Sequence, residues 1–255
     1  MEYRIGTSGY SFEDWVGNFY PAGTQRREMF AHYLRAFRTV ELNFTYYRMP
    51  VARTLESIAG RSGEGFTFWV KANQETTHRQ NRAVAGEFID GLAPMIESGK
   101  LAGVLLQFPQ SFHRTVANRQ YLAAAIDDLS AVPLAAEFRH RSWDCPETLA
   151  GLRDRSVTLA VPDAPALPDL YRPAAALTTR TGYLRLHSRD AGKWYAGAAA
   201  RYDYNYSREE LTAIAHNWAE LAAQADRVYA FFNNCHGGQA AANAQAFEKI
   251  LEEIG

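Results

Sequence analysis

The sequence contains very little cysteine. Only Cys145 and Cys235 occur among its 255 residues, and they lie far apart in the chain. Such spacing provides neither a disulfide framework nor a pair of thiols placed to bind a metal, so a reduced, cytoplasmic location fits best. The first ten residues, MEYRIGTSGY, lack the basic segment and apolar run of a signal peptide. No stretch approaches the roughly 18 apolar residues of a membrane helix, so we expect no membrane partner.

Net charge is also nearly absent, at −1, with a sequence pI of about 6.7. Domains that bind duplex DNA are usually strongly basic, so nucleic acid is not the favoured partner. Hydrophobic residues make up 47% of the chain, which is enough for a sizeable core and too much for disorder. No repeat, linker or low-complexity tract divides the sequence. We therefore expect a single domain over residues 1–255.

Short apolar segments alternate with helical patterns along the whole chain. The capping-box pair Ser207 and Glu210 marks the start of one helix. At 162–176, where a sixth helix is expected, the sequence is rich in proline and alanine and predicts a loop or a short helix. The strand segments are eight in number: 3–8, 39–43, 66–72, 102–108, 134–138, 157–161, 182–187 and 228–233. Eight strands alternating with helices predict a closed (β/α)₈ barrel, the TIM-barrel fold of the α/β class.

Polar or charged residues end seven of these eight strands. The carboxyl ends of the strands form the rim that holds the active site in barrels of this kind. Strands also end in polar residues simply because loops begin there, but burying this many charges is costly unless they pair with one another and with a ligand. The rim residues are Glu41, Asn43, Lys71, Gln107, Glu137, Arg139, Asp163, Arg185, His187, Asn233 and Asn234.

Three cations of this rim favour an anionic ligand: Lys71, Arg139 and Arg185. Gly237 and Gly238 precede the last helix, where free backbone N–H groups and the helix dipole can hold an anion, although glycines are also ordinary turn residues. A phosphate or a carboxylate would suit such donors.

Several segments resemble one protein family over nearly the whole chain. They include GTSGYSF at 6–12, TVELNFTYYRMP at 39–50, KANQETTH at 71–78, LLQFPQSF at 105–112, AAEFRHRSW at 135–143, YLRLH at 183–187 and FFNN at 231–234. The sequence resembles the domain of unknown function 72 (YecE-like) family. This resemblance implies a TIM barrel without an established activity, often compared with the xylose isomerase and endonuclease IV barrels. Its motif positions add Tyr47 and His78 to the candidate residues.

The sequence therefore predicts an enzyme that binds an anionic small molecule and works without a metal or other cofactor. The candidate catalytic residues are Lys71, Glu137, His187 and Glu41, with Lys71 as a base or Schiff-base former. An ion pair with a glutamate is the alternative role for Lys71. The candidate substrate-binding residues are Asn43, Tyr47, His78, Gln107, Arg139, Asp163, Arg185, Asn233 and Asn234. Two other functions remain open: metal-dependent chemistry on nucleic acid or a sugar, and ligand binding without catalysis.

Overall fold

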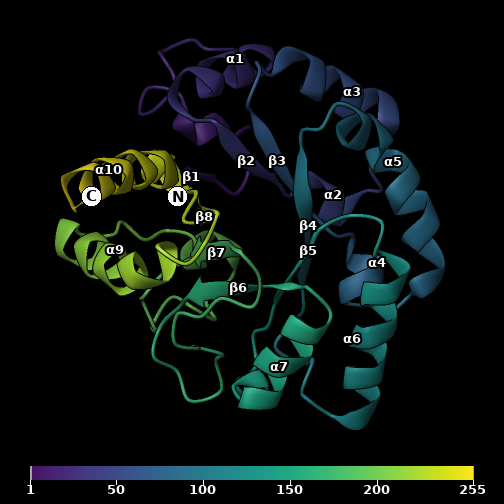
Figure 1. Ribbon diagram of the computed structural model, residues 1–255. Coiled ribbons are helices and arrows are strands. Elements are labelled where there is room, and N and C mark those ends of the chain that lie inside the picture. The colour runs from purple at the N-terminus through teal and green to yellow at the C-terminus, as the bar shows by residue number, and fades with distance from the viewer. Residues whose placement is uncertain (1, 255) are drawn as a thin grey trace.

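Eight parallel strands form one sheet in the order β1-β8-β7-β6-β5-β4-β3-β2, which curls into a barrel (Figure 1). The structure is a computed structural model that describes residues 2–254, apart from the side chain of residue 198. The strands are β1 (Glu2–Thr7), β2 (Thr39–Leu42), β3 (Thr67–Lys71), β4 (Leu101–Gln107), β5 (Leu134–Glu137), β6 (Thr158–Asp163), β7 (Thr181–Leu186) and β8 (Arg227–Phe232). The predicted (β/α)₈ barrel is confirmed.

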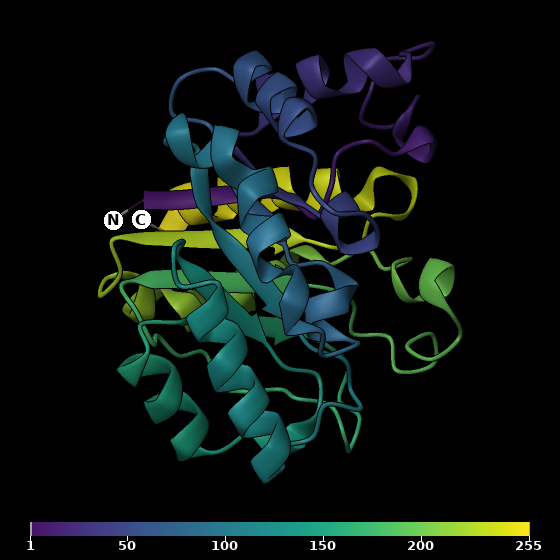
Figure 2. The same ribbon diagram turned by 90° about the vertical axis from the view of Figure 1, so that its right-hand side faces the viewer.

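Helices form the outer layer around the strands (Figure 2). The longer ones are α1 (Arg26–Ala36), α3 (Ala52–Arg61), α5 (Ala85–Glu97), α6 (Val116–Asp128), α7 (Pro146–Asp154), α9 (Arg208–Ala222) and α10 (Gln239–Ile254). Short turns are η1 (Glu13–Trp15), α2 (Phe44–Tyr47), α4 (Gln74–Thr77), η2 (Arg82–Val84), η3 (Arg141–Trp143), α8 (Ala198–Arg201) and η4 (His236–Gly238). The capping box of Ser207 and Glu210 begins α9, as predicted. Within 2–254, no helix has the length and apolar character needed to cross a membrane.

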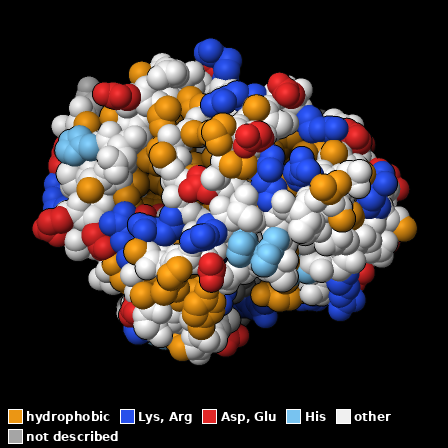
Figure 3. Space-filling view, turned by 90° about the horizontal axis from the view of Figure 1, so that it is seen from below, with side chains coloured by type: hydrophobic (Ala, Val, Ile, Leu, Met, Phe, Trp, Pro, Cys, Tyr) orange, Lys and Arg blue, Asp and Glu red, His pale blue; other side chains and the backbone are white. Residues whose placement is uncertain are grey.

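A loop connects β6 and β7, where the repeating pattern would place a helix. This confirms the prediction of a loop or a short helix at 162–176. Pro165, Pro168 and Pro173 interrupt it, and proline removes the N–H that a helix needs. A cavity of about 530 Å³ lies here, between the outer side of β6 and β7 and helix α9. Figure 3, a view from the side of α7 and this loop, shows a hollow with an apolar floor.

The barrel is closed least firmly between β1 and β2. These strands are joined by one isolated bridge, between Ser8 and Glu41, and by a 2.8 Å hydrogen bond from the Gly9 N–H to the Glu41 carbonyl. By contrast, β1 and β8 are in register over six residue pairs. Both contacts lie at the carboxyl ends of the two strands, next to the polar residues.

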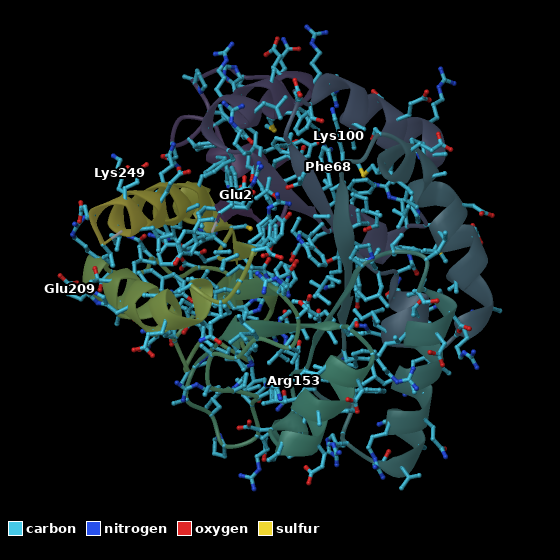
Figure 4. All side chains as sticks on the ribbon, in the orientation of Figure 1. Glu2, Phe68, Lys100, Arg153, Glu209 and Lys249 are labelled. Atoms are coloured by element: carbon cyan, nitrogen blue, oxygen red, sulfur yellow. The ribbon has the colours of Figure 1, made fainter. Side chains whose placement is uncertain are left out.

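An aromatic layer fills the barrel below those ends. Trp69 stacks on Tyr183 with ring centroids 4.6 Å apart, and Tyr229 contacts Trp69 edge-on at 5.6 Å. Gly103 makes this packing feasible, because a Cβ there would lie 2.5 Å from the Trp69 ring. Phe68, which precedes Trp69 in β3, points the other way, into the layer between strands and helices (Figure 4). This alternation sets the direction of every polar side chain further along the strands.

Candidate functional site at the mouth of the barrel

Polar side chains continue the inward-facing positions beyond the aromatic layer. We call the space that they surround, at the carboxyl ends of the strands, the mouth. Trp69 is followed on the same face by Lys71, and Tyr183 is followed by Arg185 and then His187. The strand period of two residues thus brings charges from distant parts of the sequence onto one surface.

Arg185 links two buried carboxylates across the mouth. Its Nε and Nη2 donate to Glu41 at 2.8 and 2.7 Å, and its Nη1 donates to Glu137 at 2.5 Å. The Tyr183 hydroxyl also donates to Glu41, at 2.6 Å. All three charged side chains are at most 1% exposed. Because burial of an unpaired charge is costly, this pairing is what allows two carboxylates to lie inside the barrel.

Arg139 and His187 surround the remaining oxygen of Glu137. Arg139 forms an ion pair with Glu137, and its Nη2 lies 3.1 Å from Nε2 of His187. Burial would raise the pKa of Glu137, but Arg139 and Arg185 outweigh it and hold the pKa well below its usual range. Burial, and then the charge of Arg139, lower the pKa of His187 to about 3. At neutral pH Glu137 is therefore ionised and His187 is neutral.

Lys71 is the cation of the mouth without a carboxylate partner. Its Nζ donates to Oε1 of Gln107 at 2.7 Å and lies 4.2 Å from the centre of the Tyr46 ring. Gln107 is oriented by its own hydrogen bond, from Nε2 to the Phe108 carbonyl at 2.7 Å. Among residues 2–254, Lys71 makes no ion pair at 4 Å or closer. Burial and the charge of Arg185 lower the pKa of Lys71 to about 7, against the opposing effect of the two glutamates.

A cavity of about 170 Å³ opens above these groups. Its lining includes Lys71, Gln107, Arg139 and Arg185. The other lining residues come from the segments after β1, β2, β7 and β8: Ser8, Phe12, Asn43, Tyr46, Tyr47, Tyr202, Asn233 and Cys235. Two buried polar atoms here, Ser8 Oγ and Asn43 Oδ1, have no hydrogen-bond partner within the described part of the chain. Buried polar atoms are normally satisfied, so these two are available to a ligand.

The segment that follows β7 covers one side of the mouth. The buried Trp194 has Arg139 5.6 Å from its ring centre and the His187 ring 6.3 Å away. The neighbouring Tyr195 accepts a 3.0 Å hydrogen bond from Gln110, in the loop after β4. In Figure 2 this segment, which carries α8, extends beyond the carboxyl ends of the strands. It reduces the access of water to Arg139 and His187.

The structure brings most of the predicted residues together: some line the cavity, and Glu41, Glu137 and His187 form the buried network beside it. Three others lie outside the mouth. Asp163 points outward, where Arg189 donates to it at 2.8 Å and the Tyr206 hydroxyl at 2.7 Å. Asn234 also points away and binds the Tyr204 carbonyl at 2.7 Å. His78 packs behind Tyr46, with ring centroids 5.0 Å apart. These contacts make all three supports of the site.

The glycines before the last helix lie next to the carboxylate of Asp14. The Gly237 N–H donates to the Asp14 carboxylate at 2.7 Å, so this amide already has an anionic partner. Gly237 and Gly238 have φ values of 58° and 85°, which explains why glycine is needed at this turn. Burial raises the pKa of the adjacent Cys235 thiol, which therefore stays protonated and is a poor nucleophile.

Tyr183 and Ser8 are two of the residues at the mouth that the sequence interpretation did not name as site residues. Tyr183 was recoverable, because it precedes Arg185 and His187 at the same spacing of two and therefore faces inward. Ser8 carried no such signal. It enters the mouth through the bridge to Glu41, a long-range pairing that no local pattern encodes.

Comparison with known proteins agrees with this description of the fold. The family model described as "Protein of unknown function DUF72" matches residues 4–254. The chain belongs to the DUF72 family. It is 30% identical to the UPF0759 protein YunF of Bacillus subtilis (strain 168) over 268 aligned residues, covering 97% of this chain and 94% of that protein. The expected family membership is therefore confirmed.

Two solved DUF72 structures resemble this one closely. A DUF72 family protein of Thermotoga maritima MSB8 superimposes with a TM-score of 0.93 at 38% identity, covering 99% of this chain and all of that one (100%). A DUF72 family protein of Enterococcus faecalis V583 gives a TM-score of 0.87 at 26% identity, covering 98% and 95% of the two chains. The descriptions of these DUF72 relatives state a family and no reaction.

The carboxylates and imidazoles of the mouth are not grouped as metal ligands. Among residues 2–254, no cluster of three or more His, Cys, Asp or Glu side chains is placed to hold a metal ion. Glu41 and Glu137 instead direct their oxygens at guanidinium groups. The two glutamates are therefore part of an ion-pair network with Arg139 and Arg185, and this network supports a cationic pocket.

Proposed function

We propose that this DUF72 protein is an enzyme that binds a small anionic molecule in the mouth, with the Lys71 amine as general base or Schiff-base former. The observation that carries this proposal is the placement of Lys71. Its amine faces the 170 Å³ cavity, is held by Gln107 and lacks a carboxylate partner within the described residues. An amine in such a site is partly neutral near pH 7 and can accept a proton or attack a carbonyl.

The other groups take supporting roles in this proposal. Arg139 and Asn233 supply donors for the anion at the edge of the cavity, and Ser8 and Asn43 supply free polar atoms for a hydroxyl or carbonyl. Glu41 and Glu137 neutralise Arg185 rather than exchange protons. We assign His187 to orienting Arg139 rather than to proton transfer, since its pKa lies far below neutrality.

An anionic aldehyde tests the reactivity of Lys71 directly. Pyridoxal 5′-phosphate followed by borohydride reduction attaches a stable label to reactive amines, and peptide mapping locates it. The chain has only four lysines, Lys71, Lys100, Lys193 and Lys249, so each can be followed separately. We expect Lys71 to label fastest, with a rate that rises through a midpoint near pH 7.

Lys249 serves as the internal control, because its side chain is exposed on α10. Competition by inorganic phosphate should slow labelling at Lys71 and leave Lys249 unaffected. Labelling of Lys71 no faster than Lys249, or a Lys71 rate that still climbs above pH 9 without a midpoint near neutrality, would sink the proposal.

A further inference from the structure

A second, larger hollow opens beside the mouth. It has a volume of about 820 Å³ and lies between the loop after β1 and helices α1, α2 and α3. We call it the arginine groove, defined by Arg26, Arg27, Arg48 and Arg61 around a floor that includes Phe12 and Phe44. The mouth and the arginine groove are continuous, because Ser8, Phe12, Asn43 and Tyr47 line both.

The arginines of this groove have no carboxylate partner within the described residues, unlike several exposed arginines elsewhere in the molecule. Arg82, Arg155, Arg180 and Arg208 each pair with a carboxylate, at distances of 2.5 to 2.6 Å. The four groove arginines are exposed, and within residues 2–254 none forms an ion pair at 4 Å or closer. The groove lining contains no acidic residue of the described chain. A concentration of unpaired guanidinium groups is suited to an anionic ligand.

The groove also exposes apolar surface that a folded protein usually buries. Tyr47 is 71% exposed and Val51 is 60% exposed, and both lie along its edge. Sites for small molecules commonly have volumes of about 300–1,000 Å³ with mainly apolar walls. The mouth, at about 170 Å³, has room for a small anionic group, whereas the groove has room for a larger body.

We propose that the arginine groove holds the distal part of the substrate whose anionic head enters the mouth: an apolar body that carries a second negatively charged group. This inference rests on the proposed function of the mouth. The apolar body lies against Phe12 and Phe44, and the second anion faces the arginines. The two hollows then act as one site for an elongated molecule with an anion at each end.

Three ligands of increasing complexity test this arrangement by titration calorimetry: inorganic phosphate, octyl phosphate and octanediol bisphosphate. We expect octyl phosphate to bind at least about tenfold tighter than phosphate, since each buried methylene contributes up to about fourfold. The bisphosphate should bind tighter still. The Arg27→Ala/Arg48→Ala protein should lose about tenfold in affinity for the bisphosphate and keep its affinity for phosphate.

Matched variants separate this effect from general changes in charge. Arg35→Ala removes an exposed arginine of α1 that does not line the groove and should leave all three affinities unchanged. Val51→Asp places a negative charge at the groove edge and should weaken octyl phosphate binding. Val116→Asp, at an equally exposed valine (61%) at the start of α6, should not.

The two proposals fail in different ways. Equal affinities for the three ligands, or an Arg27→Ala/Arg48→Ala protein that matches Arg35→Ala, overturn the groove proposal and leave the mouth in place. A Lys71→Met protein that binds all three ligands as the wild type does overturns the mouth as the head site, and with it the shared substrate. Weaker binding of all three by Lys71→Met, together with selective loss in the arginine variant, supports both.

Discussion

The guanidinium of Arg185 binds the Glu41 carboxylate through two hydrogen bonds, from Nε at 2.8 Å and from Nη2 at 2.7 Å. The third donor of the same guanidinium reaches Glu137 on another strand. One side chain of β7 therefore connects β2 and β5 through the interior of the barrel. Arg185 is thus the residue that joins the two carboxylates, each of which has a further partner, Tyr183 or Arg139.

Replacing Arg185 by Met should destabilise the protein by about 3–5 kcal/mol, the usual consequence of leaving buried charges without a partner. Urea unfolding measures this loss, and Arg35→Met, an exposed change on α1, serves as control. The pKa of Glu137 is held low in the folded state, so its contribution is present above its unfolded pKa and is lost as the pH falls. The difference in unfolding free energy between variant and wild type should narrow as the pH falls below about 4.3. A difference of equal size at pH 7 and at about pH 3 would contradict this account.

The lowered pKa of Lys71 should also appear in the pH dependence of stability. In the unfolded chain the amine stays protonated to about pH 10.4, whereas in the folded protein it releases its proton near pH 7. The unfolded state therefore binds more protons between these values, and stability should rise with pH across that range. The slope stays below about 1.4 kcal/mol per pH unit, because a single amine releases at most one proton.

In the Lys71→Met protein, this rise of the unfolding free energy with pH should be absent. In the Lys249→Met protein it should remain. The measurement is the difference in unfolding free energy between each variant and the wild type, taken from pH 7 to pH 10. Parallel curves for the wild type and Lys71→Met would show that the amine titrates at its ordinary pKa.

Gly103→Ala should destabilise the barrel by about 1–3 kcal/mol, because the new methyl group must displace the Trp69 ring. Gly151 offers the opposite case on helix α7, where an added Cβ meets no atom within 4 Å. Gly151→Ala should stabilise the protein by up to about 1 kcal/mol. Thermal unfolding of both variants checks the pair, and equal effects would contradict the packing described for Trp69.

Asp163→Ala separates structural support from ligand binding. Loss of the hydrogen bonds from Arg189 and Tyr206 should cost about 1.5–3 kcal/mol. The labelling rate of Lys71 by pyridoxal 5′-phosphate should not change, because Asp163 lies outside the mouth. A strong decrease in that rate in a folded variant would return Asp163 to the site.

The sequence predicted the fold because strand and helix periods are local and repeat around the barrel. It also predicted Glu41, Lys71, Glu137, Arg185 and His187 as members of one site, since the ends of parallel strands meet at one rim. It could not place Asp163 and Asn234. One step along a strand turns a side chain to the opposite face, so only one of the neighbours Asn233 and Asn234 can point inward.

The arginine groove was not predicted, because its parts come from three helices and a loop whose packing is not encoded in any short motif. Its arginines are scattered between positions 26 and 61 and form a group only after folding. The pairing that leaves Lys71 free also depends on tertiary geometry, because the sequence alone allowed an ion pair with either glutamate.

The arginine groove lies beside the weakly joined strands β1 and β2. The groove is bordered on one side by the loop after β1 and on the other by the loop after β2, so any molecule held in it spans the least tightly joined strands of the barrel. Such a molecule would contact both loops and so hold β1 and β2 together. When the groove is occupied, the backbone amides of β1 and β2 should therefore exchange more slowly with solvent. Hydrogen exchange in these two strands would then report that the ligand is bound.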